Sequence, residues 1–243
     1  FAPESANRPS ALICLGHAQV KLASCRIASR SPISLLTYNI WFHGSNQHAA
    51  AAAARASQPS PTYQFSDRIA SVARVIISAN ADVVCLQEVT PWSDSILRGH
   101  SGLRSRYEFS KYGNQGTYGV LMLVRKGWRV SDGFVFTDMP TMMGRRLLSV
   151  HVQPPSGLAQ VLINTAHFES LSSAQIRKKQ LEVYASLSKR HTAGPSIICG
   201  DFNFCSYRNY AIGKGPLENQ VLAELLPDHR DLWPMLHTSE GEG

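Results

Sequence analysis

Four apolar, strand-like segments follow one another in the middle of this chain, and this order is the strongest constraint on its fold. They cover residues 118–124, 128–136, 146–152 and 158–166, and Pro154-Pro155-Ser156-Gly157 interrupts the chain between the last two. Strands that alternate with helices surround this block. The combination predicts a mixed-sheet α/β sandwich and argues against a doubly wound parallel sheet.

Two segments show helical periodicity. After Ser66, apolar residues recur at i, i+3, i+4, i+7 and i+8, with the serine as the expected N-cap: Ile69, Val72, Ala73, Ile76 and Ile77. The second helix is expected after Ser172, which forms a capping box pattern with Gln175. On this helix the basic triplet 177–179 is expected to face solvent.

Length and charge limit the class of protein. A chain of 243 residues with 44% hydrophobic and 17% charged residues is typical of one soluble globular domain. No apolar run approaches the roughly 18 residues that span a bilayer, so no membrane segment is expected. The formal net charge of +7 favours an anionic partner, whether nucleic acid, a phosphorylated ligand or an anionic membrane. Five cysteines, two of them within predicted strands, favour a reducing compartment.

The ends and one internal stretch lack clear patterns. Residues 1–31 contain a single acidic residue and no periodicity, so a disordered or linker segment is expected there, followed by one domain over 32–243. Residues 43–61 are rich in Ala, Ser, Gln and Pro and are expected to form an insertion. The chain begins with Phe1 and ends in Glu240-Gly241-Glu242-Gly243, so we expect it to be part of a longer protein.

Polar residues follow several of the predicted strands. Asn39, Glu88, His167 and Asp201 each end an apolar run, and Asn203 follows two residues after the last. Each could be an ordinary turn or surface residue. A carboxylate at the end of a buried strand is costly, however, unless it binds a cation. Strand ends that converge at one edge of a sheet are where α/β proteins place ligands.

The residue types point to phosphoryl chemistry. Oxygen ligands with few Cys or His side chains suit Mg²⁺ or Mn²⁺ and do not suit Zn²⁺. Such a cation, held by one or two carboxylates and by phosphate oxygens, serves phosphodiester or phosphomonoester hydrolysis. A Gly-Lys-Ser/Thr phosphate loop is absent from the sequence, which argues against nucleoside triphosphate binding of that kind.

The ordered motifs resemble those of the endonuclease/exonuclease/phosphatase superfamily, and most of all its 5′-tyrosyl-DNA phosphodiesterases of type 2. The resemblance extends from about residue 33 to residue 233. Four segments carry it: Thr37-Tyr38-Asn39-Ile40-Trp41, Leu86-Gln87-Glu88, Ala166-His167-Phe168-Glu169-Ser170 and Gly200-Asp201-Phe202-Asn203. A fifth, Thr141-Met142-Met143 leading into Arg145, resembles a strand entry of the same enzymes.

The resemblance implies a four-layered α/β sandwich, with two mixed sheets between helices, and a Mg²⁺-dependent (or Mn²⁺-dependent) hydrolase. Glu88 would be the metal ligand, and Asn39 would orient the phosphate or a metal-bound water. Asp201 would activate the attacking water, Asn203 would hold that geometry, and His167 would stabilise charge on the phosphate. Three further residues would contact the substrate: Tyr118, Arg145 and Ser170.

Two departures from the family pattern stand out. Trp41 occupies the position at which animal tyrosyl-DNA enzymes have an acidic residue, so Glu88 and waters alone would hold the cation. The Ser-Asp-His segment that closes the superfamily's site is missing, and Asp228-His229 is a poor substitute because it follows Asn203 too closely. We therefore expect the chain to stop before the last strands of the domain.

The functional expectation is a monomeric, nuclear DNA-repair enzyme that hydrolyses 5′-phosphotyrosyl DNA, although a cytoplasmic location stays open. Other phosphodiesterases of the superfamily are alternatives, namely a nuclease, a deadenylase or a lipid phosphodiesterase. A third reading is a truncated, non-catalytic module that binds nucleic acid through its basic surface.

Overall fold

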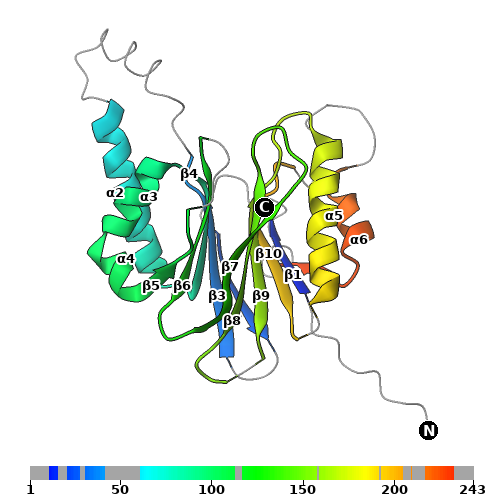
Figure 1. The fold of residues 1–243 in the computed structure, drawn as a ribbon, viewed down its shortest axis with the longest axis horizontal. Helices are drawn as coiled ribbons and strands as arrows, with labels where there is room; N and C mark the ends of the chain where they lie inside the picture. Colours follow the sequence, from blue (N-terminus) through cyan, green and yellow to red (C-terminus); the bar gives the residue numbers. More distant parts are fainter. Residues whose placement is uncertain are drawn as a thin grey trace, which may run out of the picture.

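Two β-sheets lie face to face between two layers of helices in the computed structural model (Figure 1). The structure describes residues 11–15, 21–27, 31–41, 61–112, 117–157, 159–191, 193–204, 209 and 217–232.

The first sheet has five strands in the described part of the chain. Their spatial order is β2 (Lys21–Ile27), β3 (Ser31–Asn39), β4 (Val83–Val89), β6 (Gly119–Arg125) and β5 (Tyr107–Phe109). Strands β3 and β4 are parallel, and the other neighbours are antiparallel. The sheet is therefore mixed.

The second sheet has six described strands. Their order is β11 (His229–Asp231), β1 (Ala11–Leu15), β10 (Ser196–Asp201), β9 (Val161–His167), β8 (Arg146–Gln153) and β7 (Arg129–Asp138). The strands from β11 to β9 are mutually parallel, whereas β8 and β7 are antiparallel to their neighbours.

The helices form the two outer layers (Figure 1). The five-stranded sheet is covered by α2 (Pro61–Ala79), α3 (Pro91–Gly99) and α4 (Ser101–Arg106). The six-stranded sheet is covered by α5 (Ala174–Arg190) and α6 (Gln220–Leu225). The prediction of a four-layered α/β sandwich with two mixed sheets is confirmed.

The layers explain why the central strands are apolar on both faces. On β4, Val83 and Cys85 pack in the cluster between the two sheets, while Val84 and Leu86 pack in the cluster beneath the helices. Successive side chains of a strand point to opposite faces, so both sets are buried. This is why β4 reads as a nearly continuous hydrophobic run.

The expectation for residues 1–31 does not hold for two stretches. β1 lies within the six-stranded sheet with Ile13 opposite Ile198, and β2 pairs with β3. Five residues are too few to show a period, and the parallel partner of β1 lies far along the chain. Ser31 begins β3, and the other residues of this segment lie outside the described residues, as do residues 43–60 of the predicted insertion.

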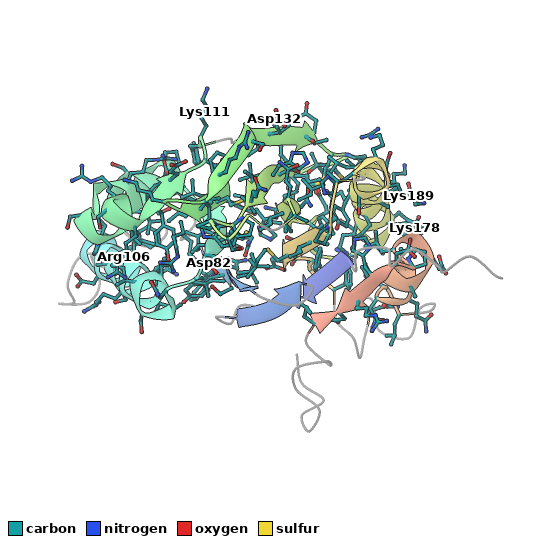
Figure 2. All side chains as sticks on the ribbon, turned by 90° about the horizontal axis from the view of Figure 1, so that it is seen from below. Asp82, Arg106, Lys111, Asp132, Lys178 and Lys189 are labelled. Atoms are coloured by element: carbon teal, nitrogen blue, oxygen red, sulfur yellow. The ribbon has the colours of Figure 1, made fainter. Side chains whose placement is uncertain are left out.

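The helix starts also differ from the prediction. α2 begins at Pro61, so Ser66 lies inside the helix and does not cap it. Ser173 is the N-cap of α5 and makes no capping hydrogen bond through its side chain. Arg177, expected to face solvent, is 1% exposed, whereas Lys178 is partly exposed and Lys179 is exposed. Lys189, in the last turn of α5, lies on the outer side of the helix (Figure 2). No helix among the described residues is long and apolar enough to cross a membrane.

Candidate active site

The sequence-predicted site residues meet at one edge of the paired sheets. Asn39 and Glu88 lie at the ends of β3 and β4 in the five-stranded sheet. His167 and Asp201 end β9 and β10 in the other sheet, directly opposite each other in the parallel register. Each sheet therefore supplies one half of the site.

A bulge in β4 aims Glu88 at this edge. The pairing of β4 with β6 shifts register between Leu86 and Val89, and Glu88 has a positive φ of 60°. A bulge of this kind redirects one side chain out of the regular alternation. Gln87 is consequently buried between the sheets, and Glu88 reaches the partly open edge.

Gly200 brings β9 and β10 close together just before Asp201. Its φ is +146°, and a Cβ atom built on it would lie 2.0 Å from the carbonyl oxygen of Ala166. A side chain cannot be accommodated at that distance from a backbone atom. The glycine therefore serves the close contact between the two strands.

The amide of Asn39 joins the two carboxylates of the site. Its Nδ2 donates to Glu88 Oε1 at 3.0 Å and to Asp201 Oδ2 at 2.8 Å. Its Oδ1 accepts the backbone N–H of Trp41 at 2.9 Å, which fixes the orientation of the amide. Two carboxylates converging on one amide make a site of negative charge that favours a cation.

His167 lies between Asp201 and Arg145. Arg145 Nη1 is 3.0 Å from His167 Nδ1, and His167 Nε2 is 3.8 Å from Asp201 Oδ2. A guanidinium nitrogen can only donate, so Nδ1 accepts and the proton of the neutral ring is carried on Nε2. That proton is directed to the Asp201 side of the site.

The surroundings of His167 favour the neutral ring. The side chain is 4% exposed. Burial, with a further contribution from the charge of Arg145, holds the pKa of His167 well below its usual range. The imidazole is therefore suited to donate a hydrogen bond to an anion without carrying a charge itself.

Arg145 is a buried cation whose partners are neutral. It is 4% exposed, and besides His167 its guanidinium donates to Ser170 Oγ at 3.1 Å. Its Nε has no hydrogen-bond partner, and it forms no ion pair with any carboxylate of the described residues. The guanidinium also lies over the ring of Tyr118, 4.9 Å from its centroid. A buried guanidinium without an acidic partner is suited to an anionic ligand.

Tyr118, Ser170 and Asn203 thus all lie at the site. The ring of Tyr118 is 5.9 Å from that of His167. The backbone N–H of Asn203 donates to Asp201 Oδ1 at 2.9 Å, and its side chain donates to the carbonyl of Phe168 at 2.9 Å. Asn203 therefore ties Asp201 to the loop that follows β9.

Sequence reasoning missed the carboxylate that supports Arg145. Glu169 is fully buried and accepts hydrogen bonds from Thr141 Oγ1 at 2.7 Å and from the backbone N–H of Met142 at 2.9 Å. Thr141 Oγ1 in turn accepts from the backbone N–H of Arg145 at 3.0 Å. The sequence could have indicated Glu169 as a residue of the site, because it lies within the His167-Phe168-Glu169-Ser170 motif.

A second missed group connects the sheets beneath the site. Gln87 Nε2 donates to Thr37 Oγ1 at 3.2 Å in its own sheet and to Thr165 Oγ1 at 3.1 Å in the other sheet. All three side chains are buried. Thr37 lies two residues before Asn39, Gln87 lies one residue before Glu88, and Thr165 lies two residues before His167. The contact among them therefore aligns the two halves of the site.

Comparison of the sequence with models of protein families identifies the family of this chain. The model of the endonuclease/exonuclease/phosphatase family matches residues 36–218, which include all of these site residues. The chain belongs to this family. No curated protein matches the chain.

Solved structures of endonuclease/exonuclease/phosphatase proteins have the same fold. D. rerio TDP2 in complex with a single strand DNA product is 22% identical, with a TM-score of 0.58, over 79% of this chain and 64% of that chain. D. rerio TDP2 humanized by 14 mutations is 24% identical, with a TM-score of 0.57, over 72% of this chain and 67% of that chain. The human Nocturnin catalytic domain with bound sulfate is 16% identical, with a TM-score of 0.57, over 79% of this chain and 70% of that chain. The chain thus spans about two thirds of these relatives, and the resemblance inferred from the motifs is confirmed.

Proteins of the endonuclease/exonuclease/phosphatase family generally depend on a divalent metal, and the residues of this site fit a hard cation. Glu88 and Asp201 offer carboxylate oxygens on either side of Asn39. The described residues contain no group of three or more His, Cys, Asp or Glu side chains arranged to enclose a metal. This donor set suits Mg²⁺ or Mn²⁺, which keep several waters and bind phosphate oxygens, better than Zn²⁺.

Proposed function

We propose that this chain is a Mg²⁺-dependent (or Mn²⁺-dependent) phosphodiesterase that hydrolyses the 5′-phosphotyrosyl linkage of DNA. The observation that carries the proposal is a row of neighbouring side chains, here called the catalytic row, that runs from Arg145 through His167, Asp201 and Asn39 to Glu88. Hydrogen bonds join its members except His167 and Asp201, whose Nε2 and Oδ2 atoms are 3.8 Å apart. One end of the row is suited to an anion, and the other end is suited to a cation. A phosphodiester bound together with a divalent metal supplies both charges.

Each residue has a role that its contacts support. Arg145 and the Nε2–H of His167 bind phosphate oxygens and stabilise the negative charge of the transition state. Asp201, held by Asn39 and Asn203, orients the attacking water and accepts its proton. Glu88 would hold the cation, which supplies charge neutralisation at the phosphate when bound.

The substrate is proposed from the resemblance. The His-Phe-Glu-Ser segment resembles that of the 5′-tyrosyl-DNA phosphodiesterases, and one TDP2 structure of the same fold contains a single strand DNA product. The net charge of +7 is compatible with a nucleic acid partner. We propose DNA 5′ ends with a tyrosyl adduct as the substrate, and a monomeric nuclear DNA-repair enzyme as the biological context.

A second candidate comes from the other structural relatives. Nocturnin has a TM-score of 0.57, equal to that of humanized D. rerio TDP2. ANGEL2, a 2′,3′-cyclic phosphatase, has a TM-score of 0.53 in complex with adenosine-2′,3′-vanadate. The alternative function is therefore hydrolysis of another nucleotide phosphoester by the same residues.

The test is a comparison of substrates. The protein is incubated with a 5′-phosphotyrosyl oligonucleotide and, separately, with a 2′,3′-cyclic nucleotide, in each case with Mg²⁺ and with EDTA. We expect metal-dependent release of tyrosine, and we expect its loss in E88Q and D201N with oligonucleotide binding retained. Glu108→Gln, an exposed position on β5 far from the site, is the matched control.

The outcomes separate the candidates. Turnover of the cyclic nucleotide alone would replace the tyrosyl substrate and keep the catalytic assignment. Normal turnover in E88Q or D201N would remove that residue from its role. Binding of DNA without turnover of either substrate would favour a non-catalytic nucleic-acid-binding module.

A further inference from the structure

We infer that Trp41, Arg68, Phe65 and Trp92 form a stacking platform for an unpaired nucleobase of a single strand bound in the active site. The inference rests on the proposed function, because it assigns a nucleic acid strand to that site. The platform lies beside the catalytic row and uses none of its residues. It also assigns a role to Trp41, which departs from the family pattern.

The four side chains form a continuous series of contacts. The guanidinium of Arg68 lies over the ring of Trp41, 5.6 Å from its centroid, and over the ring of Phe65, 4.6 Å from its centroid. The rings of Phe65 and Trp92 are stacked, with centroids 4.8 Å apart and planes inclined by 18°. Arg68 therefore joins Trp41 to the Phe65–Trp92 pair.

Both ends of this series are open to solvent. Trp41 is 67% exposed and Trp92 is 42% exposed, while Phe65 between them is 8% exposed. Trp92 is stacked on the buried Phe65, and Arg68 links Trp41 to the same ring, so two aromatic side chains with exposed surface lie where a ligand can reach them. Nucleobases stack on such faces whatever their sequence.

The backbone of Trp41 is held in a conformation that costs energy. Its φ is 54°, in the left-handed region that favours glycine and is unfavourable for a bulky residue. Hydrogen bonds impose this conformation: the Trp41 N–H donates to Asn39 Oδ1 at 2.9 Å, and Arg68 Nη2 donates to the Trp41 carbonyl at 2.5 Å. Strain of this kind is characteristic of ligand-binding positions.

The same contacts attach the platform to the catalytic residues. Arg68 Nη1 donates to the carbonyl of Ile40 at 2.9 Å, in the residue that follows Asn39. Asn39 itself binds both Glu88 and Asp201. A phosphate at the catalytic row would therefore place a neighbouring base within reach of Trp41.

Charge selects a nucleic acid strand as the occupant. The platform contains the cation of Arg68, and the cation of Arg145 lies at one end of the catalytic row. The chain carries a formal net charge of +7. A ligand with flat aromatic rings joined by negative phosphates complements both features, whereas an apolar peptide complements only the rings.

Binding is measured first, in EDTA so that no turnover occurs. The probes are a short single-stranded oligonucleotide with a 3′ fluorophore and the same backbone with abasic sites in place of its bases. We expect W41A to weaken binding of the base-bearing strand about 10-fold, and W41F to weaken it less than about 3-fold, because phenylalanine retains a ring face. The abasic strand is expected to bind equally to all variants. Val135→Ala, an exposed apolar residue on β7, is the matched control.

A fluorescence readout separates stacking from a structural effect. A base stacked on Trp41 quenches its emission, so the base-bearing strand is expected to quench the protein more strongly than the abasic strand. In W41F this difference is expected to shrink while affinity is largely retained. Equal weakening of both strands by W41A, or unchanged binding, would overturn the inference.

The inference and the proposed function fail in different ways. Base-dependent binding that requires Trp41, without release of tyrosine, would leave the platform in place and reject the tyrosyl substrate. Release of tyrosine with unchanged KM in W41A and W92A would reject the platform and keep the function.

Discussion

Arg145 is a buried residue whose charge nothing in the described protein neutralises. Its guanidinium contacts an imidazole nitrogen, a hydroxyl, a methionine sulfur and the ring of Tyr118, and its Nε has no hydrogen-bond partner. Removing a cation from water is expensive unless an anion accompanies it. A bound phosphate would remove this cost, which links the stability of the protein to its ligand.

Inorganic phosphate is accordingly expected to raise the melting temperature of the protein through Arg145. Binding to the native state alone stabilises it by mass action. The measurement is a thermal unfolding series with increasing phosphate for the unmodified protein, R145Q and R146Q. Arg146 is the matched control, because it is the next residue and pairs with Asp138 at 2.8 Å. We expect R146Q to retain the phosphate response and R145Q to lose most of it; equal responses would contradict the assignment.

Some residues of the site could be predicted from the sequence and others could not. Asn39, Glu88, His167 and Asp201 each follow an apolar run, and strands that end at one edge bring their last residues together. The positive φ of Trp41 could not be predicted, because one of the hydrogen bonds that impose it comes from Arg68, 27 residues further along the chain. Positions were predictable, and backbone conformations fixed by tertiary contacts were not.

At the scale of secondary structure elements, α5 is secured through its buried face. Arg177 Nε and Nη2 donate to the two carboxylate oxygens of Glu218, both at 2.7 Å. Arg177 Nη1 donates to the carbonyls of Glu169 and Leu171, at 2.7 and 2.8 Å. One side chain thus connects the helix to the segment before α6 and to the loop that follows His167.

Substitution of Arg177 is expected to destabilise the protein far more than substitution of its neighbour. R177M leaves the partly buried Glu218 without its partner and two carbonyls without a donor, so we expect a loss of about 3 to 5 kcal/mol. K178A is the matched control, with an expected change within about 0.5 kcal/mol. Urea unfolding of both variants measures the difference. A loss in R177M no larger than that in K178A would show that the pair contributes no net stability.

The sequence could not show which basic residue of α5 is buried. Arg177, Lys178 and Lys179 are consecutive, and the partner of Arg177 lies 41 residues further along the chain. Helical periodicity is read from apolar residues, so it cannot reveal an arginine whose buried environment is an ion pair.

His229 on β11 is expected to make the fold sensitive to acid. Its Nε2 lies 2.7 Å from the hydroxyl of Tyr184 on α5, and its Nδ1 is buried without a partner. Burial lowers the pKa of His229 to about 4, partly opposed by Asp228. Between this value and the ordinary value of about 6.5, the unfolded chain binds a proton that the native chain does not, so stability falls as pH falls through that window.

The measurement is the free energy of unfolding from urea titrations between pH 7 and pH 5, for the unmodified protein and H229Q. We expect the unmodified protein to lose stability over this range and H229Q to lose less of it. An identical dependence on pH in both proteins would exclude His229 as the cause.

At the scale of the whole molecule, positive charge is expected to govern binding of nucleic acid. A formal net charge of +7 accompanies a site built around Arg145 and a platform built around Arg68. Affinity for a single-stranded oligonucleotide is expected to fall as salt rises, with a slope of about −0.7 per phosphate contacted on a log–log plot. Binding is measured by fluorescence anisotropy over a salt series, and R68Q and R145Q should each flatten the slope. Affinity independent of salt would contradict this view.

The overall architecture was predictable because its pattern repeats along the chain. Alternating helices and strands, with a block of four strands, indicated an α/β sandwich before any contact was known. The short strands β1, β5 and β11 were missed, since three to five residues carry too little pattern. The pairing of β1 with β10 and β11 also depends on residues far away in the sequence, which local propensity does not contain.

The hydrogen bonds of Gln87 to Thr37 and Thr165 have a consequence for how activity is lost. The catalytic row crosses from one sheet to the other, so a slide of one sheet along the other would separate Asn39 from Asp201 while both sheets stayed intact. The amide of Gln87 opposes this slide beneath the site, as the hydrogen bond between Asn39 and Asp201 does within it. For the proposed catalyst, misalignment of the two sheets is therefore a route to inactivity that is distinct from unfolding.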